Sequence, residues 1–303
     1  MPSSPRHDRR TFLRSAVGLV SSVAAGRILA ACVGATQSDG ASASPDAGGA
    51  DELRVLRMNG RPDHATGDFP NPGCPIAIRE RERVYYVPRF PRVADALTPL
   101  DFWELGLAFS GVAFDPSGPS YRGDDASGWM FENAHPVVAP HLGLDAQMAH
   151  VQPSGAYHYH AFAPVLRERA SGGLVQLGWA ADGFPIYGST GYADPLDPES
   201  PLVTLRPSYR LKDGPRPAGG PGGNHDGVFV PDFAFDPEAG DLDEANGRFG
   251  VTPEFPEGTY HYVLTETFPY IPRFYRGTPH PSFAHPHGPG LQGTPPALRD
   301  YRG

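Results

Sequence analysis

The segment Ser154–Phe162, SGAYHYHAF, places two tyrosines and two histidines in strict alternation. In an extended strand, successive side chains point to opposite faces. His158 and His160 would therefore share one face, and Tyr157 and Tyr159 the other. Two imidazoles side by side on a strand are a common source of two ligands for zinc or copper. The spacing predicts that His158 and His160 bind a transition metal ion.

A metal site of this kind needs at least one ligand from outside the segment. His150 is close in sequence, and His261 lies in a second Tyr-His-Tyr segment, TYHYV at residues 259–263. Either histidine can serve as the third ligand. Each metal-bound imidazole also needs a partner for its other ring nitrogen. The candidate polar partners are Asp145, Asp182, Asp243, Tyr157 and Tyr159.

The same residues allow other functions. A metal-activated water would make the protein a metal-dependent hydrolase, with Asp182 or Asp243 as the base. A second alternative is a non-enzymatic cell-surface module that binds glycans or a partner protein through exposed tyrosines: Tyr157, Tyr159, Tyr187, Tyr260, Tyr262 and Tyr270. In a third, the histidines and tyrosines are hydrogen-bonded core residues. The sequence leaves open whether the protein is an enzyme.

Calcium is the weaker candidate for the metal. Carboxylates gather in the segment PEAGDLDEANGRF, and Asn246–Gly247 makes a turn there. An EF-hand loop needs oxygen ligands at alternating positions before its glycine, but here Ala245 interrupts the pattern. We expect a solvated acidic turn. No glycine-rich phosphate loop, nucleophile elbow or His-Glu-x-x-His zinc motif is present in the sequence.

The elements that must position these residues are short. The sequence contains 37 glycines and 36 prolines, which predict abundant turns and few long helices. Alternating or aromatic-rich runs predict seven strands: LRVLRM, RVYYVP, WELGLAF, AYHYHAF, LVQLGWA, GVFVPDFAF and TYHYVLT. Two short helices are expected, at residues 163–170 and 241–246. The predicted fold class is α+β, predominantly short antiparallel β-strands with long Gly/Pro-rich loops.

Two stretches of the chain are related to each other. Residues 144–160 and residues 242–262 both begin with Leu-Asp and both contain Pro-x-Gly-x-Tyr-His-Tyr. This alignment pairs His158 with His261, and His150 with Arg248. It predicts an internal pseudo-repeat in which a metal site is asymmetric and centred on the first copy.

The N-terminus has the features of an export signal, predicted to span residues 1–31. The pair Arg9-Arg10 precedes Phe12, a moderately apolar stretch follows, and LAAC ends at Cys32. The apolar stretch is too short to span a bilayer, which takes about 20 residues. Paired arginines are typical of Tat export, and LAAC resembles a lipobox in which Cys32 is lipidated.

The rest of the chain divides by composition. Residues 32–50 have almost no large apolar side chains, which predicts a flexible tether. Residues 51–277 are globular in composition, and residues 278–303 form a Pro/Gly/His-rich tail expected to lack regular structure. We expect an exported protein, anchored by lipid on the periplasmic or cell-surface face of a bacterial membrane. The formal charge is −9 and there is no basic face, which excludes nucleic acid as a partner.

Several motifs together resemble the YHYH domain family of exported bacterial proteins. They are NGRPDH, GLAFSGVAFDP, LDAQMAHVQPSGAYHYH, GWAADGFPIYG, LDEANGRFGVTPEFPEGTYHYVLT and FPYIPRFYRG. The resemblance covers about residues 55–277, and the motifs occur in the same order. It implies one exported domain built around the Tyr-His-Tyr-His segment. It transfers no catalytic residue to this chain.

Overall fold

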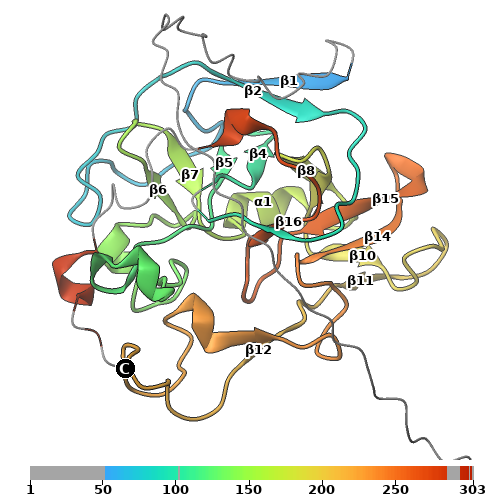
Figure 1. Cartoon of the computed structure of the whole chain (residues 1–303). Coiled ribbons are helices and arrows are strands. Elements are labelled where there is room, and N and C mark those ends of the chain that lie inside the picture. Colours follow the sequence, from blue (N-terminus) through green and yellow to red (C-terminus); the bar gives the residue numbers. More distant parts are fainter. Residues whose placement is uncertain (1–51, 102, 285–293, 300, 302–303) are drawn as a thin grey trace, which may run out of the picture. The chain divides into compact units, whose positions relative to one another are not determined.

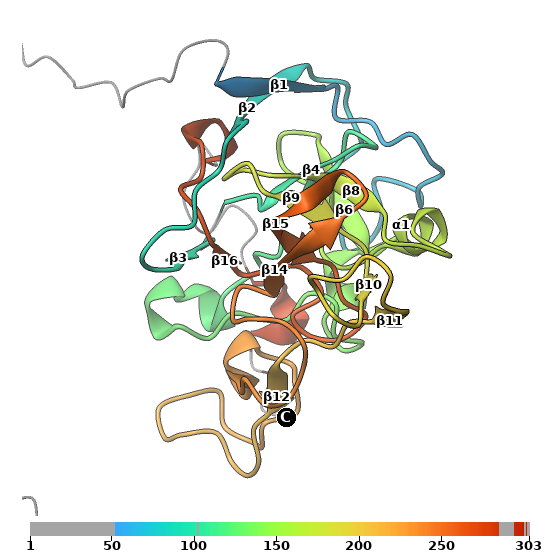
Figure 2. The same cartoon turned by 90° about the vertical axis from the view of Figure 1, so that its right-hand side faces the viewer.

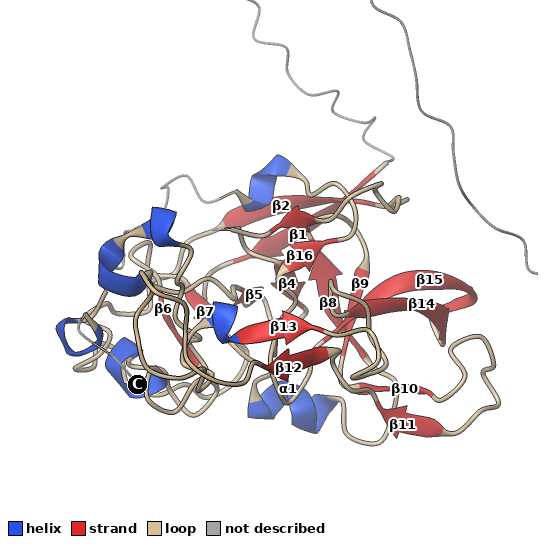
Figure 3. Ribbon diagram, turned by 60° about the horizontal axis from the view of Figure 1, so that its bottom comes forward, coloured by secondary structure: helices blue, strands red, loops and turns tan. Residues whose placement is uncertain are grey.

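The computed structural model describes residues 52–101, 103–284, 294–299 and 301. The expected signal and tether, residues 1–50, lie outside this part of the chain. The described residues form mostly short strands joined by long loops, with few helices (Figures 1 and 3). The helices are α1 (Pro164–Arg169) and six short 3-10 helices, η1 (Tyr121–Gly123), η2 (Asp125–Ser127), η3 (Ala139–Leu142), η4 (Val230–Asp232), η5 (Pro281–Phe283) and η6 (Pro296–Leu298). None of the described helices has the length and apolar character needed to cross a bilayer.

An eight-stranded sheet forms the centre of the fold. Its strands, in spatial order, are β14 (Gly247–Thr252), β15 (Phe255–Val263), β9 (Pro185–Tyr187), β8 (Gln176–Ala180), β4 (Gly106–Ala108), β5 (Ala113–Phe114), β7 (Tyr157–Tyr159) and β6 (Ala149–Val151). Figure 2 views this sheet with β14 and β15 toward the reader. The pairings β15–β9 and β5–β7 are parallel, and the other five are antiparallel.

The pairing pattern of this sheet is the same when it is read from either edge. At one edge, the β6–β7 hairpin lies parallel to β5, which is in turn antiparallel to β4. At the other edge, the β14–β15 hairpin lies parallel to β9, which is antiparallel to β8. The two sets of four strands meet at the antiparallel β4–β8 pair. Each set therefore presents an outer hairpin that contains a Tyr-His-Tyr segment.

Four two-stranded sheets complete the strand content of the described residues. They are β1 (Leu53–Met58) with β2 (Arg83–Pro88), β10 (Thr190–Tyr192) with β11 (Leu202–Thr204), β12 (Tyr209–Leu211) with β13 (Phe233–Phe235), and β16 (Phe274–Tyr275) with β3 (Thr98–Pro99). Figures 1 and 2 both show the β1–β2 pair and β12 on opposite sides of the central sheet. Six of the seven predicted apolar runs contain an observed strand, and the seventh, TYHYVLT, overlaps β15, which confirms the β-rich part of the expected fold.

The core is unusually rich in buried tyrosine. Tyr157, Tyr159 and Tyr262 are each fully buried within the main hydrophobic cluster. A buried tyrosine contributes a large apolar ring but needs a partner for its hydroxyl. Tyr157 and Tyr262 donate to Asp145 and Asp182, respectively. The tyrosine face of β7 is thus core, which leaves the opposite face for the histidines.

Two local expectations were tested by the structure with different results. The predicted helix at residues 163–170 is confirmed as α1. The predicted helix at residues 241–246 is wrong: these residues form a turn, in which Asn246 adopts a positive φ of 55°. The Asp243 side chain accepts from the Gly247 N–H at 3.0 Å and stabilises the turn instead of capping a helix.

The C-terminal segment is less irregular than expected. The Phe283 ring, in η5, is fully buried and lies 4.5 Å from the Tyr85 ring, centroid to centroid. Leu298, in η6, is also buried, in a second hydrophobic cluster that contains Phe131 and Phe229. The described residues beyond 277 therefore contribute to the core. The Pro- and His-rich composition around Phe283 concealed this from the sequence.

Candidate metal centre

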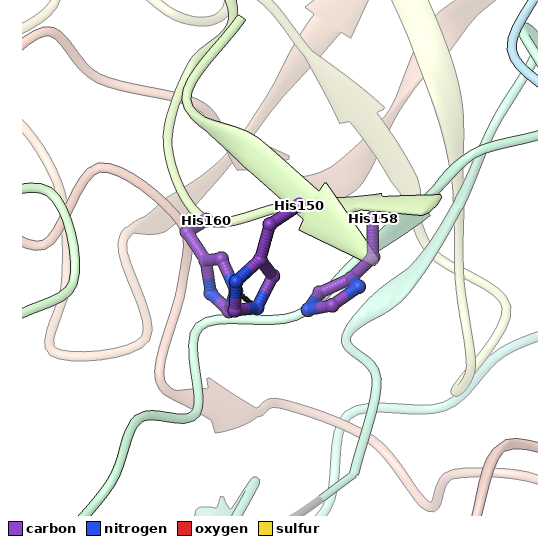
Figure 4. A group of neighbouring side chains, drawn as sticks. All are labelled: His150, His158 and His160. Atoms are coloured by element: carbon purple, nitrogen blue, oxygen red, sulfur yellow. Dashed lines mark hydrogen bonds between the residues drawn. The ribbon is translucent and has the colours of Figure 1, made fainter. Parts of the chain in front are cut away.

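Three buried histidines meet beside the β6–β7 hairpin (Figure 4). His150 in β6 lies directly opposite His158 in β7, and His160 comes two residues after His158. Because side chains alternate along a strand, all three imidazoles point to the same face of the hairpin. Their candidate ligand nitrogens all lie within 4.8 Å of one another. The three residues are 2%, 2% and 3% exposed. We call these residues the histidine triad.

The local sequence fixes the register that brings the triad together. A hydrogen bond from the Gln152 N–H to the Ala156 carbonyl, 2.9 Å long, closes the hairpin turn. Gly155 in this turn has a φ of +90°, a conformation that a residue with a side chain rarely adopts. Beyond β7, the His160 N–H donates to the Met148 carbonyl at 2.9 Å. This bond extends the pairing by one step and holds His160 in line with His158.

Hydrogen bonds orient the imidazoles of the triad, and the longest of these places His158 Nδ1 3.5 Å from the Ala156 carbonyl oxygen. The Nδ1 atom of His150 lies 2.7 Å from the Leu142 carbonyl oxygen, so this nitrogen carries a proton and donates. The Nε2 atoms of His150 and His160 lie 3.0 Å apart. The Nδ1 atom of His160 lies 2.7 Å from the side-chain nitrogen of Asn133. The aspartates expected from the sequence are not among these ring-nitrogen partners.

Burial keeps His150 and His160 in the form that binds metals. It lowers the pKa of His150, against a smaller opposing effect of the bond to Leu142. It lowers the pKa of His160 well below its ordinary value, and the neighbouring His158 and His150 lower it further. These two imidazoles are therefore neutral at neutral pH. Neutral imidazole is the form that ligates zinc and copper.

Asp115 is a charged neighbour of the triad that the sequence analysis missed. It follows β5, which pairs parallel to β7 with Ala113 beside His158 and Phe114 beside Tyr159. The next step of this register puts Asp115 beside His160, on the histidine face. The residue is 4% exposed, and its negative charge acts to raise the pKa of both His150 and His160. This negative charge favours a cation among the imidazoles.

The carboxylate of Asp115 is held in place by neighbouring donors. Its Oδ1 accepts from the Ser117 N–H at 3.0 Å, and its Oδ2 accepts from the Gln152 side chain at 3.3 Å. The same Gln152 amide lies 3.5 Å from the Glu104 carboxylate. The only sequence signal for Asp115 was its place at the end of GLAFSGVAFDP. The sequence of one strand does not show which distant strand it pairs with.

Comparison with known proteins identifies the family of this chain. The sequence profile of the YHYH protein family matches residues 84–277. This chain belongs to the YHYH protein family. The matched region contains the whole histidine triad, together with Asp115 and Asn133. No curated protein and no solved structure gives a significant match.

The second Tyr-His-Tyr segment of this YHYH protein lies at the other edge of the sheet. His261 is in β15, opposite Arg248 in β14, and its ring packs against Tyr187 at 5.3 Å between centroids. Its Nδ1 is 3.3 Å from the Thr259 carbonyl, and its buried Nε2 has no hydrogen-bond partner among the described residues. His261 does not belong to the triad. Of the two candidate third ligands, the structure brings His150, and not His261, to His158 and His160.

Each of the three candidate aspartates accepts a hydrogen bond from a tyrosine hydroxyl. Asp145 accepts from the Tyr157 hydroxyl at 2.7 Å. Asp182 accepts from Tyr262 at 2.5 Å. Asp243 accepts from Tyr260 at 3.0 Å. Burial raises the pKa of Asp182 to about 6. These carboxylates therefore form Asp–Tyr pairs that tie the sheet to adjacent turns.

The tyrosines expected to form an exposed platform do not form one. Five of the six are buried: Tyr157, Tyr159, Tyr187, Tyr260 and Tyr262. The hydroxyl of Tyr159 lies 2.6 Å from His64 Nε2, at the far side of the hairpin from the triad. Burial of these rings in the core removes the feature on which a glycan- or protein-binding platform was predicted.

The acidic turn at residues 236–244 has arginine partners. Asp236 pairs with Arg210 at 2.6 Å, and Asp241 pairs with Arg206 at 3.2 Å. Within the described part of the chain, the histidine triad is the group of metal-ligating side chains that converges, and this turn does not. The geometry thus gives no support to the calcium alternative.

Proposed function

We propose that this YHYH-family protein binds one transition metal ion through His150, His158 and His160. The observation that carries the proposal is the convergence of three buried imidazoles, whose candidate ligand nitrogens lie within 4.8 Å of one another. Burying three polar rings in edge-on contact costs free energy unless hydrogen bonds or a bound ion satisfy their nitrogens. A bound cation satisfies them together, and the Asp115 carboxylate supplies negative charge nearby.

Zinc or copper fits this set of ligands best. Imidazole nitrogen suits both metals, whereas calcium and magnesium prefer oxygen. Zinc binds imidazole at about 2.0–2.1 Å, so two nitrogens on one tetrahedral ion lie about 3.4 Å apart. The His150 and His160 Nε2 atoms, at 3.0 Å, are already close to this separation.

Metal binding is better supported than hydrolysis. Three histidines with an open fourth position can activate a water molecule, as hydrolytic zinc sites do. However, the carboxylates proposed as bases, Asp182 and Asp243, accept hydrogen bonds from Tyr262 and Tyr260. The triad itself is almost completely buried. We therefore propose metal binding as the function and keep the hydrolase as the alternative.

The test is metal content after purification without a histidine tag. We expect about one equivalent of zinc or copper in the wild type and none in the His158→Ala/His160→Ala double variant. The matched control is His261→Ala, which removes the equivalent histidine of the other hairpin and should keep the metal. Equal metal content in wild type and double variant, or none in either, would overturn the proposal.

We also propose that the two halves of the sheet arose from one repeated unit, with the metal site retained in one half. The support is the register: His150 lies opposite His158 in β6–β7, and Arg248 lies opposite His261 in β14–β15. Both hairpins follow a residue with φ of 55°, Met148 or Asn246. In the second hairpin, the arginine brings a positive charge where a metal ion would need a ligand.

We further propose that the protein is exported and anchored to the membrane by lipid on Cys32. The twin arginines Arg9 and Arg10 and the LAAC sequence at residues 29–32 support this proposal. The triad would then bind its metal outside the cytoplasm.

A further inference from the structure

The outer face of the β1–β2 ribbon is apolar, although it lies at the surface of the protein. Val55 in β1 lies opposite Tyr86 in β2, and these residues are 49% and 38% exposed. The alternate residues of β2, Tyr85 and Val87, are fully buried against the core. Because side chains alternate along a strand, Val55 and Tyr86 point away from the core. A sheet with one solvated face ordinarily has polar residues on that face, so this one is a candidate contact surface.

The apolar surface continues into the residues that follow β2. Phe90 is 76% exposed and Val93 is 49% exposed. Phe90 is the most exposed large apolar side chain of the described residues. The Arg89 Nε–H donates to the Leu53 carbonyl at 3.0 Å, which holds this segment beside the first residue of β1. We call four exposed side chains the ribbon face: Val55, Tyr86, Phe90 and Val93.

Positive charges lie in the same segments as the ribbon face. Residues 53–58 and 83–93 contain no aspartate or glutamate and five arginines: Arg54, Arg57, Arg83, Arg89 and Arg92. Arg57, Arg89 and Arg92 are exposed. The carboxylates of Glu52 and Asp95, just outside these ranges, leave a net positive charge here, whereas the whole chain has a formal charge of −9. Exposed apolar side chains among arginines are typical of a surface that binds anionic lipid headgroups.

The position of β1 in the chain brings this surface close to the proposed lipid anchor. Cys32 precedes Leu53 by about 20 residues, and even a fully extended chain of that length spans no more than about 70 Å. Lipid on Cys32 would therefore keep β1 within that distance of a bilayer. Such tethering gives effective concentrations on the order of 1 mM. Under this condition, a weak contact between the ribbon face and lipid is sufficient.

The described part of the chain leaves the ribbon face open. The helix η5 lies along the edge of β2, where the Tyr86 N–H donates to Ser282 Oγ at 3.0 Å. The His280 ring lies 5.5 Å from the Tyr86 ring, centroid to centroid. These contacts cover the edge of β2 and one side of Tyr86, but they leave Val55 and Phe90 exposed. Within the described residues, the surface is therefore available for contact with lipid.

We propose that the ribbon face rests on the phospholipid headgroups of the membrane to which the chain is anchored. Phe90 inserts among the headgroups, and Arg57 and Arg92 donate to lipid phosphates. This inference rests on the proposed lipid anchor, and it adds an orientation to it. The β1–β2 pair and β12 lie on opposite sides of the central sheet, so β12 faces away from the bilayer (Figures 1 and 2). The contact is too weak to hold the protein on the membrane without the lipid.

The first measurement is the depth of a nitroxide spin label in the acylated chain, purified from membranes and reconstituted into vesicles. The label is placed by Phe90→Cys, and Leu211→Cys in β12 is the matched control, because Leu211 is 46% exposed. Cys74 is buried and Cys32 carries the proposed lipid, so the label reacts at the added cysteine. In vesicles of phosphatidylglycerol and phosphatidylcholine, we expect the label at Phe90 to collide more with oxygen, which enters the bilayer, than with a water-soluble nickel chelate. The label at Leu211 should show the opposite preference.

The second measurement tests the arginines. Each arginine near an anionic surface strengthens binding about fivefold, so Arg57→Gln/Arg92→Gln should weaken the contact about 25-fold. The label at Phe90 should then prefer the nickel chelate. It should also do so in the chain with both arginines when the vesicles contain phosphatidylcholine alone. The control, Arg206→Gln/Arg210→Gln, removes two exposed arginines in and near β12 and should leave the label at Phe90 inserted.

The outcomes separate this inference from the proposed anchor. A chain that has no acyl group on Cys32 and does not sediment with the vesicles would overturn the anchor, and with it this inference. An acylated, vesicle-bound chain whose label prefers the nickel chelate as strongly at Phe90 as at Leu211 would overturn the inference alone. Equal insertion in neutral and anionic vesicles would overturn the role of the arginines. Insertion at Phe90 that depends on anionic lipid would support both.

Discussion

At the scale of single residues, the centre is defined by charge as well as by imidazoles. The triad residues His150 and His160 are held neutral by burial, while the nearby Asp115 carboxylate brings negative charge to the same face of the sheet. A neutral set of ligands beside a buried carboxylate suits a divalent cation better than an uncharged ligand. The carboxylate should therefore contribute to affinity even where it does not itself bind the metal.

Replacement of Asp115 by asparagine tests this contribution. The substitution keeps the shape of the side chain and an acceptor for the Ser117 N–H, but it removes the charge. We expect zinc affinity to fall by about 10–100-fold, the usual effect of losing a polar partner near a metal. Competition titration measures the change. The control, Asp236→Asn, removes a carboxylate that pairs with Arg210 in the acidic turn. Equal losses in both variants would contradict a local role for Asp115.

Some residues of the site were predictable from the sequence and others were not. Alternation in Tyr-His-Tyr-His correctly assigned the histidines and tyrosines to opposite faces of one strand. Proximity in sequence made His150 a candidate, and the hairpin brings it opposite His158. Asp115 and Asn133 carried no such signal. They reach the triad through the parallel β5–β7 pairing and a long loop, which depend on contacts between distant parts of the chain.

At the scale of elements, the two hairpins show what sequence alignment can and cannot predict. Aligning the two Tyr-His-Tyr segments paired His150 with Arg248 and His158 with His261. The observed registers put these residues in corresponding cross-strand pairs. The strands themselves were predictable from alternation. The turn at residues 241–246 was not predictable, because its acidic and apolar residues are also typical of the first turn of a helix. In the structure, Asn246 has a positive φ, which is incompatible with a helix at this position.

The hairpin β14–β15 should make stability depend on pH. Burial is the main cause that lowers the pKa of His261 to about 4, from an ordinary value of 6.5. Arg248 on β14 lowers it further, the bond to the Thr259 carbonyl opposes the shift, and Tyr187 on β9 packs on the ring. The unfolded chain takes up a proton at this site below pH 6.5, whereas the folded protein does so only near pH 4. Stability therefore falls as pH drops through this range, by about 3 kcal/mol from this residue.

Chemical denaturation at pH 7 and at pH 5 measures this dependence. His261→Gln, which cannot be protonated, should lose less stability between the two pH values than the wild type. Because burial also lowers the pKa of His150 and His160, part of the dependence should persist in the variant. His141→Gln, at an exposed position in η3, is the matched control and should behave as the wild type. An unchanged pH dependence in His261→Gln would contradict the assignment.

At the scale of the whole molecule, the described domain contains the candidate metal site, whereas the proposed export and anchoring rest on the N-terminal sequence alone. The YHYH-family match begins at residue 84, and the first described strand begins at Leu53. Composition alone separated this domain from the segments before it. Composition failed at the C-terminal side, where Phe283 packs into the main core despite the surrounding prolines and histidines. One buried aromatic ring can hold a short segment against the core, and the average composition of the segment does not reveal such a residue.

The two cysteines of the chain offer a direct test of membrane anchoring. Cys32 ends the LAAC sequence, while Cys74 is buried and its thiol contacts the Val151 carbonyl at 3.4 Å. If lipid on Cys32 is the anchor, Cys32→Ser should move the protein from the membrane fraction to the soluble fraction. Burial of each methylene of an acyl chain contributes about 0.8 kcal/mol, so loss of the lipid should release nearly all of it.

Cys74→Ser is the matched control, because it also removes one thiol but should leave the protein in the membrane fraction. Mass spectrometry of the wild-type N-terminus should find the acyl groups on Cys32 after cleavage following Ala31. A Cys32→Ser protein that stays with the membrane would mean that another part of the chain binds it. Full metal loading of the released Cys32→Ser protein would further show that the proposed metal binding is independent of the anchor, because the candidate ligands all lie in the described domain.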